Sequence, residues 1–266
     1  MTSVARFTTF VLVALLPAGL PAQAPVDVRA VQPERPTVAT HAYSVAPGVL
    51  EIETGVEVDR FGDGSRVLSV PTTIKIGVAS HLQLNIVAPV TGPGLSSLGA
   101  GDAALGVKWR LLDEHGVLGS FALLPALKFA SGSVPIGRGT GTTDLSLTVI
   151  SSRTIGKVSV DLNVAATWRS GDGTQAPRRA WLWTVSFGIP VRGGLGWALE
   201  YFGYPGTAGP AGTPGWSAVL TGPQLVLRRW LAVDAGVIVP LSGPQVTSFY
   251  SGMVWNAGRI WRTGAP

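Results

Sequence analysis

The sequence predicts an all-β protein, a single antiparallel transmembrane β-barrel of about twelve strands. From residue 49 onward, apolar and polar residues alternate with period two over a train of segments. Many of these segments are as long as a tilted membrane strand, roughly 9–11 residues, whereas soluble strands average about 5–6. The connections alternate in length, which is typical of barrels with short periplasmic turns and longer external loops.

The composition agrees with this class. Only 13% of the 266 residues are charged, against about 25% in an ordinary soluble domain, and the mean hydropathy is +0.35. Cysteine is absent, which excludes a disulfide framework and a thiolate metal site. Lys and Arg residues are scattered and form no stripe interleaved with aromatic residues, so we expect no nucleic-acid partner.

Residues 1–24 have the features of a signal peptide. Arg6 supplies a positive charge, FVLVALLPAGL (10–20) is a short apolar run, and AQA (22–24) fits the small-residue cleavage pattern. The apolar run is too short to span a bilayer, which makes an uncleaved anchor the weaker alternative. We therefore expect export, cleavage and a location in the outer membrane of a Gram-negative bacterium.

Residues 25–48 are polar and interrupted by prolines, which predicts an extended N-terminal periplasmic segment lying against or inside the main domain. Residues 49–266 should form the barrel. The first predicted strand, 49–59, carries apolar side chains on one face and acidic side chains on the other.

The other predicted strands repeat this alternation. The clearest is 157–169, and the least regular is 215–228, where Gly222–Pro223 predicts a bulge or a strand end. In chain order they are 66–78, 81–90, 102–112, 119–129, 143–151, 157–169, 179–189, 194–203, 215–228, 230–240 and 246–257.

The connections give the barrel an orientation. Starting in the periplasm, the first connection (60–65) is external, and an even number of strands returns the C-terminus to the periplasm. The predicted external loops are mostly longer and rich in Gly, Pro and Ser, as in 91–101, 131–143 and 204–215.

Large aromatic residues lie mostly toward the ends of the predicted strands. Aromatic rings favour the bilayer interface, which predicts a girdle, whereas a soluble core would place more of them in mid-strand. The proposed girdle residues are Trp109, Phe121, Phe129, Trp168, Trp181, Trp183, Trp197, Trp216, Trp230 and Trp255.

Polar side chains on the opposite parity should point into the barrel, because the apolar face must meet lipid. Either they satisfy one another as ion pairs, or some of them line a permeation path. A barrel of about twelve strands permits a narrow pore, blocked by residues 25–48 or by a loop. The proposed lumen residues are Glu51, Glu53, Glu57, Lys75, Gln83, Asn85, Lys108, Arg110, Lys128, Asp161, Asn163, Arg169 and Glu200.

No motif for catalysis, a cofactor or a metal stands out. The glycine-rich stretches 99–106 and 137–141 complete no nucleotide-binding pattern, and His41, His81 and His115 have no metal-ligand spacing. A lipid hydrolase on the barrel wall would need a paired Ser and His, and His81 at a strand start is the one candidate. We expect no enzyme, no cofactor and no metal.

Four stretches resemble the outer-membrane transporter-like family named for the meta-pathway of phenol degradation. They are ERPTVATHAYSVAPGVLEIETGVEV (34–58), TIKIGVASHLQLNI (73–86), GAGDAALGVKWRLLDE (99–114) and LLPALKFASGS (123–133). The resemblance runs from about residue 34 to the last strand. It implies a porin-like barrel that takes up small solutes, aromatic or hydrophobic ones among them.

The functional hypothesis is therefore a channel or transporter for small solutes, with outer-membrane lipid and a small molecule as partners. Two alternatives stay open: a structural or adhesive barrel that acts through its external loops, and the lipid hydrolase. The solute, the pore diameter and the oligomeric state are not determined by the sequence.

Overall fold

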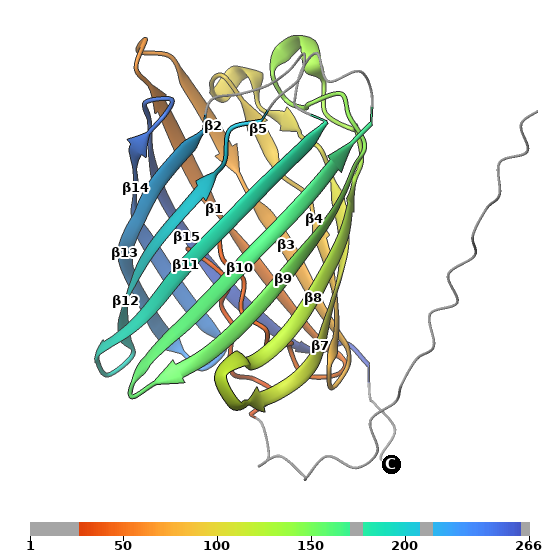
Figure 1. Cartoon of the computed structure of the whole chain (residues 1–266), viewed down its shortest axis with the longest axis vertical. Helices are drawn as coiled ribbons and strands as arrows, with labels where there is room; N and C mark the ends of the chain where they lie inside the picture. The colour runs from red at the N-terminus through yellow and green to blue at the C-terminus, as the bar shows by residue number, and fades with distance from the viewer. Residues whose placement is uncertain (1–26, 171–177, 208–214, 262–266) are drawn as a thin grey trace, which may run out of the picture.

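The structure, a computed structural model, describes residues 27–170, 178–207 and 215–261. The described strands form one closed antiparallel barrel of 12 strands, which confirms the predicted fold class (Figure 1). The proposed signal peptide, residues 1–24, lies outside the described residues, as do parts of two predicted external loops. Within the described residues, no helix is long and apolar enough to cross a membrane.

Neighbouring strands along the chain pair with each other, and the last strand pairs with the first, from Val49–Arg259 to Phe61–Val246. The strands are β1 (Val49–Phe61), β2 (Arg66–Val70), β3 (Thr72–Ala79), β4 (Leu82–Val87), β5 (Val90–Gly92), β6 (Gly99–Ala100), β7 (Ala104–His115), β8 (Gly119–Lys128), β9 (Asp144–Ile155), β10 (Val158–Arg169), β11 (Arg179–Arg192), β12 (Leu195–Tyr204), β13 (Trp216–Arg228), β14 (Leu231–Ser242) and β15 (Val246–Arg259).

Two barrel strands are each assigned in two pieces. Pro71 separates β2 from β3, and Pro89 lies between β4 and β5. Proline has no N–H to donate to a ladder, so each of these two prolines interrupts the pairing without ending the barrel strand. The short strand β6 adds to this edge from the connection that follows β5.

Connections of the two kinds lie at opposite ends of the barrel, as the sequence indicates. The turns at 80–81, 156–157 and 193–194 are short and gather at the lower end in Figure 1. The longer connections lie at the upper end, including those that carry the 3-10 helices η1 (Leu95–Ser97) and η3 (Val134–Ile136). A third 3-10 helix, η2 (Gly116–Leu118), lies in a turn of the lower end. We call the two ends the short-turn end and the long-loop end.

Pro223 does not break its strand. The sequence predicts a bulge or a strand end there, and that prediction is wrong, because β13 continues through Pro223 and pairs with Trp197 of β12. The register with β14 is the same before and after it, at Thr221–Val237 and Gln224–Asp234. Pairing with β14 is interrupted over Gly222 and Pro223, and the alternation of faces continues through them.

The outer surface of the barrel is apolar over its middle. These side chains come from several adjacent strands and share the parity that points away from the lumen. A contiguous apolar surface of this kind needs a lipid environment. Exposed members include Leu105, Val107, Leu145, Leu147, Val149, Leu162, Val164 and Leu199.

Residues 27–48, which we call the plug, lie inside the barrel and enter it from the short-turn end (Figure 1). Gly48 N–H donates to the carbonyl of Gly77 on β3, and Ile260 N–H donates to the carbonyl of Gly48. The plug is therefore fixed at its C-terminal end beside the seam where β1 meets β15.

Gly77 allows the plug to approach the wall. A Cβ at this position would overlap the carbonyl oxygens of Val45 and Ala46. We expect Gly77→Ala to lower the free energy of unfolding by about 1–3 kcal/mol, because the backbone must move to relieve the overlap. Urea unfolding of the folded barrel, followed by tryptophan fluorescence, measures the change.

Gly196→Ala is the matched control. It lies in strand β12, and its added Cβ would meet its nearest neighbour, the carbonyl oxygen of Ile189, at 3.5 Å, an ordinary contact. Equal effects of the two substitutions would contradict a specific role for the close approach at Gly77.

Candidate functional site

The proposed lumen residues are placed by the structure in two groups. Most are buried, and several of these contact the plug. Those that are nine-tenths buried or more are Glu51, Glu53, Lys75, Gln83, Asn85, Lys108, Arg110, Asn163 and Glu200. The half-buried ones are Glu57, Lys128, Asp161 and Arg169.

Side chains of the wall accept hydrogen bonds from the plug backbone. The Glu200 carboxylate accepts from Val38 N–H and Ala39 N–H, both at 2.7 Å. The Asn163 amide pairs with Thr40 in both directions, accepting from its N–H at 2.7 Å and donating to its carbonyl at 2.9 Å. These contacts replace the ladder that an irregular buried segment lacks.

The same pattern continues toward the short-turn end. Glu51 accepts from Gln32 N–H at 2.9 Å, and Glu53 accepts from Glu34 N–H at 2.8 Å. Gln83 on β4 accepts from the N–H of Val45 at 2.9 Å. Glu51 and Glu53 of the first strand therefore face backbone N–H groups of the plug inside the barrel.

Two lysines form the ionic centre of the lumen. Lys75 Nζ lies 2.7 Å from a carboxylate oxygen of Glu51 and 2.7 Å from one of Glu53. Lys108 pairs with Glu34 of the plug and donates to the His41 carbonyl at 3.0 Å. Both lysine side chains are fully buried, so these partners are what makes their charge tolerable.

This ionic centre shifts the pKa values of two plug residues. Burial opposes ionisation of Glu34, but the adjacent Lys108 and Lys75 outweigh it and hold the pKa of this carboxyl well below its usual range. Burial and then the charge of Lys108 lower the pKa of His41 to about 3. At neutral pH the plug therefore presents an ionised Glu34 and a neutral His41 to the wall.

Some plug contacts come from residues that the sequence analysis did not name. Asp234 pairs with Arg35 at 3.3 Å, Ser152 Oγ accepts from Ala42 N–H at 2.8 Å, and Asn256 donates to the carbonyl of Val28 at 3.1 Å. Each of them lies on a strand and shares the inward parity. Polar residues among apolar neighbours, as at Asp234 in β14, are the signal that identifies them.

Three of the proposed lumen residues form networks at the barrel ends instead. At the long-loop end, Lys128 pairs with Asp102 at 2.8 Å, and Arg169 lies 3.4 Å from Asp144. Burial opposes ionisation of Asp102, but Lys128 and backbone N–H groups outweigh it and lower the pKa of Asp102 to about 2. At the short-turn end, Arg110 pairs with Asp113 at 2.9 Å.

His81, the candidate for a hydrolase, lies in the turn before β4. Its Nδ1 accepts from Arg110 Nε at 3.1 Å and lies 3.9 Å from an Asp113 carboxylate oxygen. These contacts make it part of the short-turn network. Within the described ranges, no three His, Asp or Glu side chains are arranged to hold a metal ion.

Most of the proposed girdle residues lie near one end or the other of their strands, whereas Trp109 lies in the middle of β7. One assignment needs a correction. Trp216 faces the lumen, where its ring lies 5.4 Å from that of Phe202, so its assignment to the outer girdle is wrong. A place at a strand end, which is shared by residues of both faces, caused the error. Trp183 and Trp230, like Phe121, are half-buried, and the exposed members are Trp109, Phe129, Trp168, Trp181, Trp197 and Trp255.

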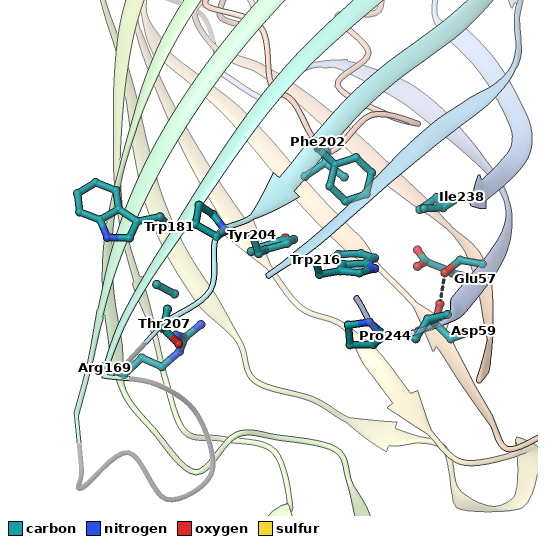
Figure 2. A pocket seen from close by; sticks show the side chains of 15 residues that line it. Glu57, Asp59, Arg169, Trp181, Phe202, Tyr204, Thr207, Trp216, Ile238 and Pro244 are labelled. Atoms are coloured by element: carbon teal, nitrogen blue, oxygen red, sulfur yellow. Dashed lines mark hydrogen bonds between the residues drawn. The ribbon is translucent and has the colours of Figure 1, made fainter. Parts of the chain in front are cut away.

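Above the plug, toward the long-loop end, the lumen contains a cavity of about 530 Å³, which we call the vestibule (Figure 2). Val38 of the plug lines it from below. Phe202 and Trp216 lie on one side, and Glu57 and Asp59 of β1 lie on another. Its size is within the usual range of small-molecule sites, about 300–1,000 Å³.

Solved structures with this fold are outer-membrane barrels. An outer-membrane channel from Pseudomonas putida F1 matches with a TM-score of 0.63 and 12% identity, over 81% of this chain and 97% of that one. The porin KdgM, solved in complex with disordered oligogalacturonate, matches with a TM-score of 0.52 and 11% identity, over 77% and 98%. Identities this low establish the fold alone, which is that of an outer-membrane β-barrel.

Comparison with protein-family models gives no match, and comparison with curated proteins gives none. The resemblance to the phenol-degradation family therefore stays a prediction.

Glu200→Gln tests how the wall holds the plug. The amide keeps one acceptor oxygen and turns an NH₂ group toward a backbone N–H, which removes a charge-assisted bond of about 1.5–3 kcal/mol. We expect amide hydrogen exchange at Val38 and Ala39 to rise by roughly tenfold or more. Asp59→Asn, a change on the same inward side without a plug contact in the described residues, should leave these two amides protected. Unchanged exchange in Glu200→Gln would show that other contacts hold this part of the plug.

The low pKa of His41 predicts a loss of stability in acid. In the unfolded chain the His41 imidazole has its ordinary pKa, about 6.5. Below that pH the unfolded chain therefore binds a proton that the folded chain does not bind. Stability should fall from about pH 6.5 toward pH 3, and the ionised Glu34 adds a loss of the same sign below its ordinary pKa, about 4.5. Urea unfolding at pH 7.5, 6 and 5 measures the slope.

His41→Gln should flatten this slope between pH 6.5 and 5, because it removes the group that titrates there. His115→Gln is the control, since His115 is exposed at the end of β7. A slope that survives His41→Gln would assign the acid sensitivity to other groups.

Proposed function

We propose that this protein is an outer-membrane channel for small solutes and that its plug holds it closed in the conformation described. Residues 1–24 direct export and are removed. The observation that carries the proposal is the manner in which the lumen is filled. A single extended segment occupies it, held by side-chain hydrogen bonds from most of the strands, beneath a vestibule at the long-loop end.

The chemistry of the lumen favours a removable plug over a permanent core. A barrel that only needed stability could fill its interior with apolar side chains, which contribute more than buried ion pairs do. Here the wall presents carboxylates, amides and lysines, and water can solvate the same groups when the plug leaves. The two ion pairs of Lys75, with Glu51 and with Glu53, join wall residues to each other and would remain after the plug leaves.

The similar structures support solute passage as the function of this fold. One of them is described as an outer-membrane channel, and KdgM is a porin solved with an oligosaccharide. The sequence resemblance adds small aromatic or hydrophobic compounds as the expected solutes. The external loops at the long-loop end would then act as the entrance, with the lumen residues biasing which solutes pass.

Deletion of residues 27–46 tests the proposal. The variant keeps residues 1–26 and the turn before β1, and we expect its conductance in planar bilayers to exceed that of the intact protein by at least about tenfold. Heat-modifiability on a denaturing gel, boiled against unboiled, verifies that both proteins are closed barrels.

The contrary result is a folded, plug-deleted barrel that conducts no better than the intact protein. That outcome would leave the plug as a structural filler and would favour the alternative of a structural or adhesive barrel. Trimming residues 131–143 at the long-loop end would then be the next test, with adhesion as the readout.

A further inference from the structure

The vestibule has an aromatic side built from two adjacent strands. Phe202 is almost fully buried, its ring meets Trp216 edge-on at 5.4 Å, and Trp216 stacks on Tyr204 with an interplanar angle of 17°. All three line the vestibule (Figure 2). The Trp216 indole N–H has no hydrogen-bond partner among the described residues and is buried. This side therefore offers flat apolar rings and one unused donor.

A second side of the vestibule is acidic. Glu57 and Asp59 stand two residues apart on β1, so their carboxyl groups share the inward face. The two carboxyl groups form a hydrogen bond, which requires one proton, so the pair then carries a single negative charge. Ser248 Oγ donates to Asp59 at 2.5 Å. Within the described parts of the chain, neither carboxyl group forms an ion pair.

The two arginines near the vestibule pair with other carboxylates. Arg35, beneath the acids at the level of Gly55, pairs with Asp234 at 3.3 Å. Arg169, at the far side of the vestibule in Figure 2, lies 3.4 Å from Asp144. The vestibule thus has an excess of negative charge beside its aromatic side.

We propose that the vestibule binds a small organic cation, an amine joined to a flat apolar body. The proposal rests on the proposed function, for which it names the class of solute. The apolar body lies on Trp216 and Phe202, and the ammonium group lies at Glu57 and Asp59. Aromatic faces attract cations as well as apolar surface, and the negative charge of the acid pair acts at short range in a partly enclosed site. An anion of the same shape is repelled by that charge.

Calorimetric titration of the intact, detergent-folded protein tests this directly. The probes are three molecules of similar shape: phenethylamine, phenethyl alcohol and phenylacetate, at pH 7.5. We expect the amine to bind at least about tenfold more tightly than the alcohol, and the anion to bind most weakly. Equal affinity for amine and alcohol would overturn the proposal, and this comparison needs no variant.

A double variant, Glu57→Gln with Asp59→Asn, locates the preference. It should bind amine and alcohol equally while it keeps its affinity for the alcohol. Asp63→Asn is the matched control, because Asp63 lies in the exposed turn that follows β1 and outside the vestibule. A preference for the amine that survives the double variant, or that Asp63→Asn abolishes, would overturn the proposed site.

The binding test and the conductance test have independent outcomes. A protein that prefers the amine but stays non-conducting after plug deletion would keep the cation site and lose the channel function. A plug-deleted protein that conducts, while the intact protein shows no preference for the amine, would keep the channel and lose the cation site.

Discussion

The hydrogen bonds between wall side chains and plug backbone are the interaction on which the rest of the structure depends. A segment without regular structure cannot satisfy its own N–H and C=O groups, and inside a narrow barrel little water reaches them. The wall must therefore supply polar atoms at fixed positions. Glu200, Asn163 and Gln83 do so from strands spread around the barrel. The inward residues of these strands are polar and bond the plug backbone. The vestibule is the part of the lumen above the plug, where Val38 lines it from below.

The buried charges of the lumen are also satisfied by groups of the wall and of the plug. Lys75 and Lys108 are fully buried, and each is compensated by carboxylates, one set from the wall and one from the plug. Buried ion pairs repay little of their desolvation cost, so they are weak devices for stability. The network divides between the wall and the plug. When the plug moves, Lys75 loses its hydrogen bond to the Gln32 carbonyl but keeps Glu51 and Glu53, whereas Lys108 loses Glu34. Acid acts on the plug half, through His41 and Glu34.

Strand positions and the direction of most side chains could be predicted from alternation alone, because period two and lipid on one side leave little freedom. The assignment of Trp216 to the girdle rested on its place at a strand end, which residues of both faces share, and this criterion failed. Alternation also places Asp234 and Asn256 inside, although they were not named as lumen residues. The path of the plug could not be predicted. It has no periodicity, and its contacts join residues far apart in sequence, such as Arg35 and Asp234, 199 positions away.

The seam between β1 and β15 has a consequence for assembly. Because the first and last strands close the barrel, β1 lacks one neighbour until synthesis is complete. The plug precedes β1, yet Asp234 and Asn256, two of its partners, lie on β14 and β15. The plug, which is made before all the strands, is thus among the last parts to be fixed. A nascent chain halted before β14 would have an open sheet edge and an unheld N-terminus, both of which need a chaperone's protection until the ring closes.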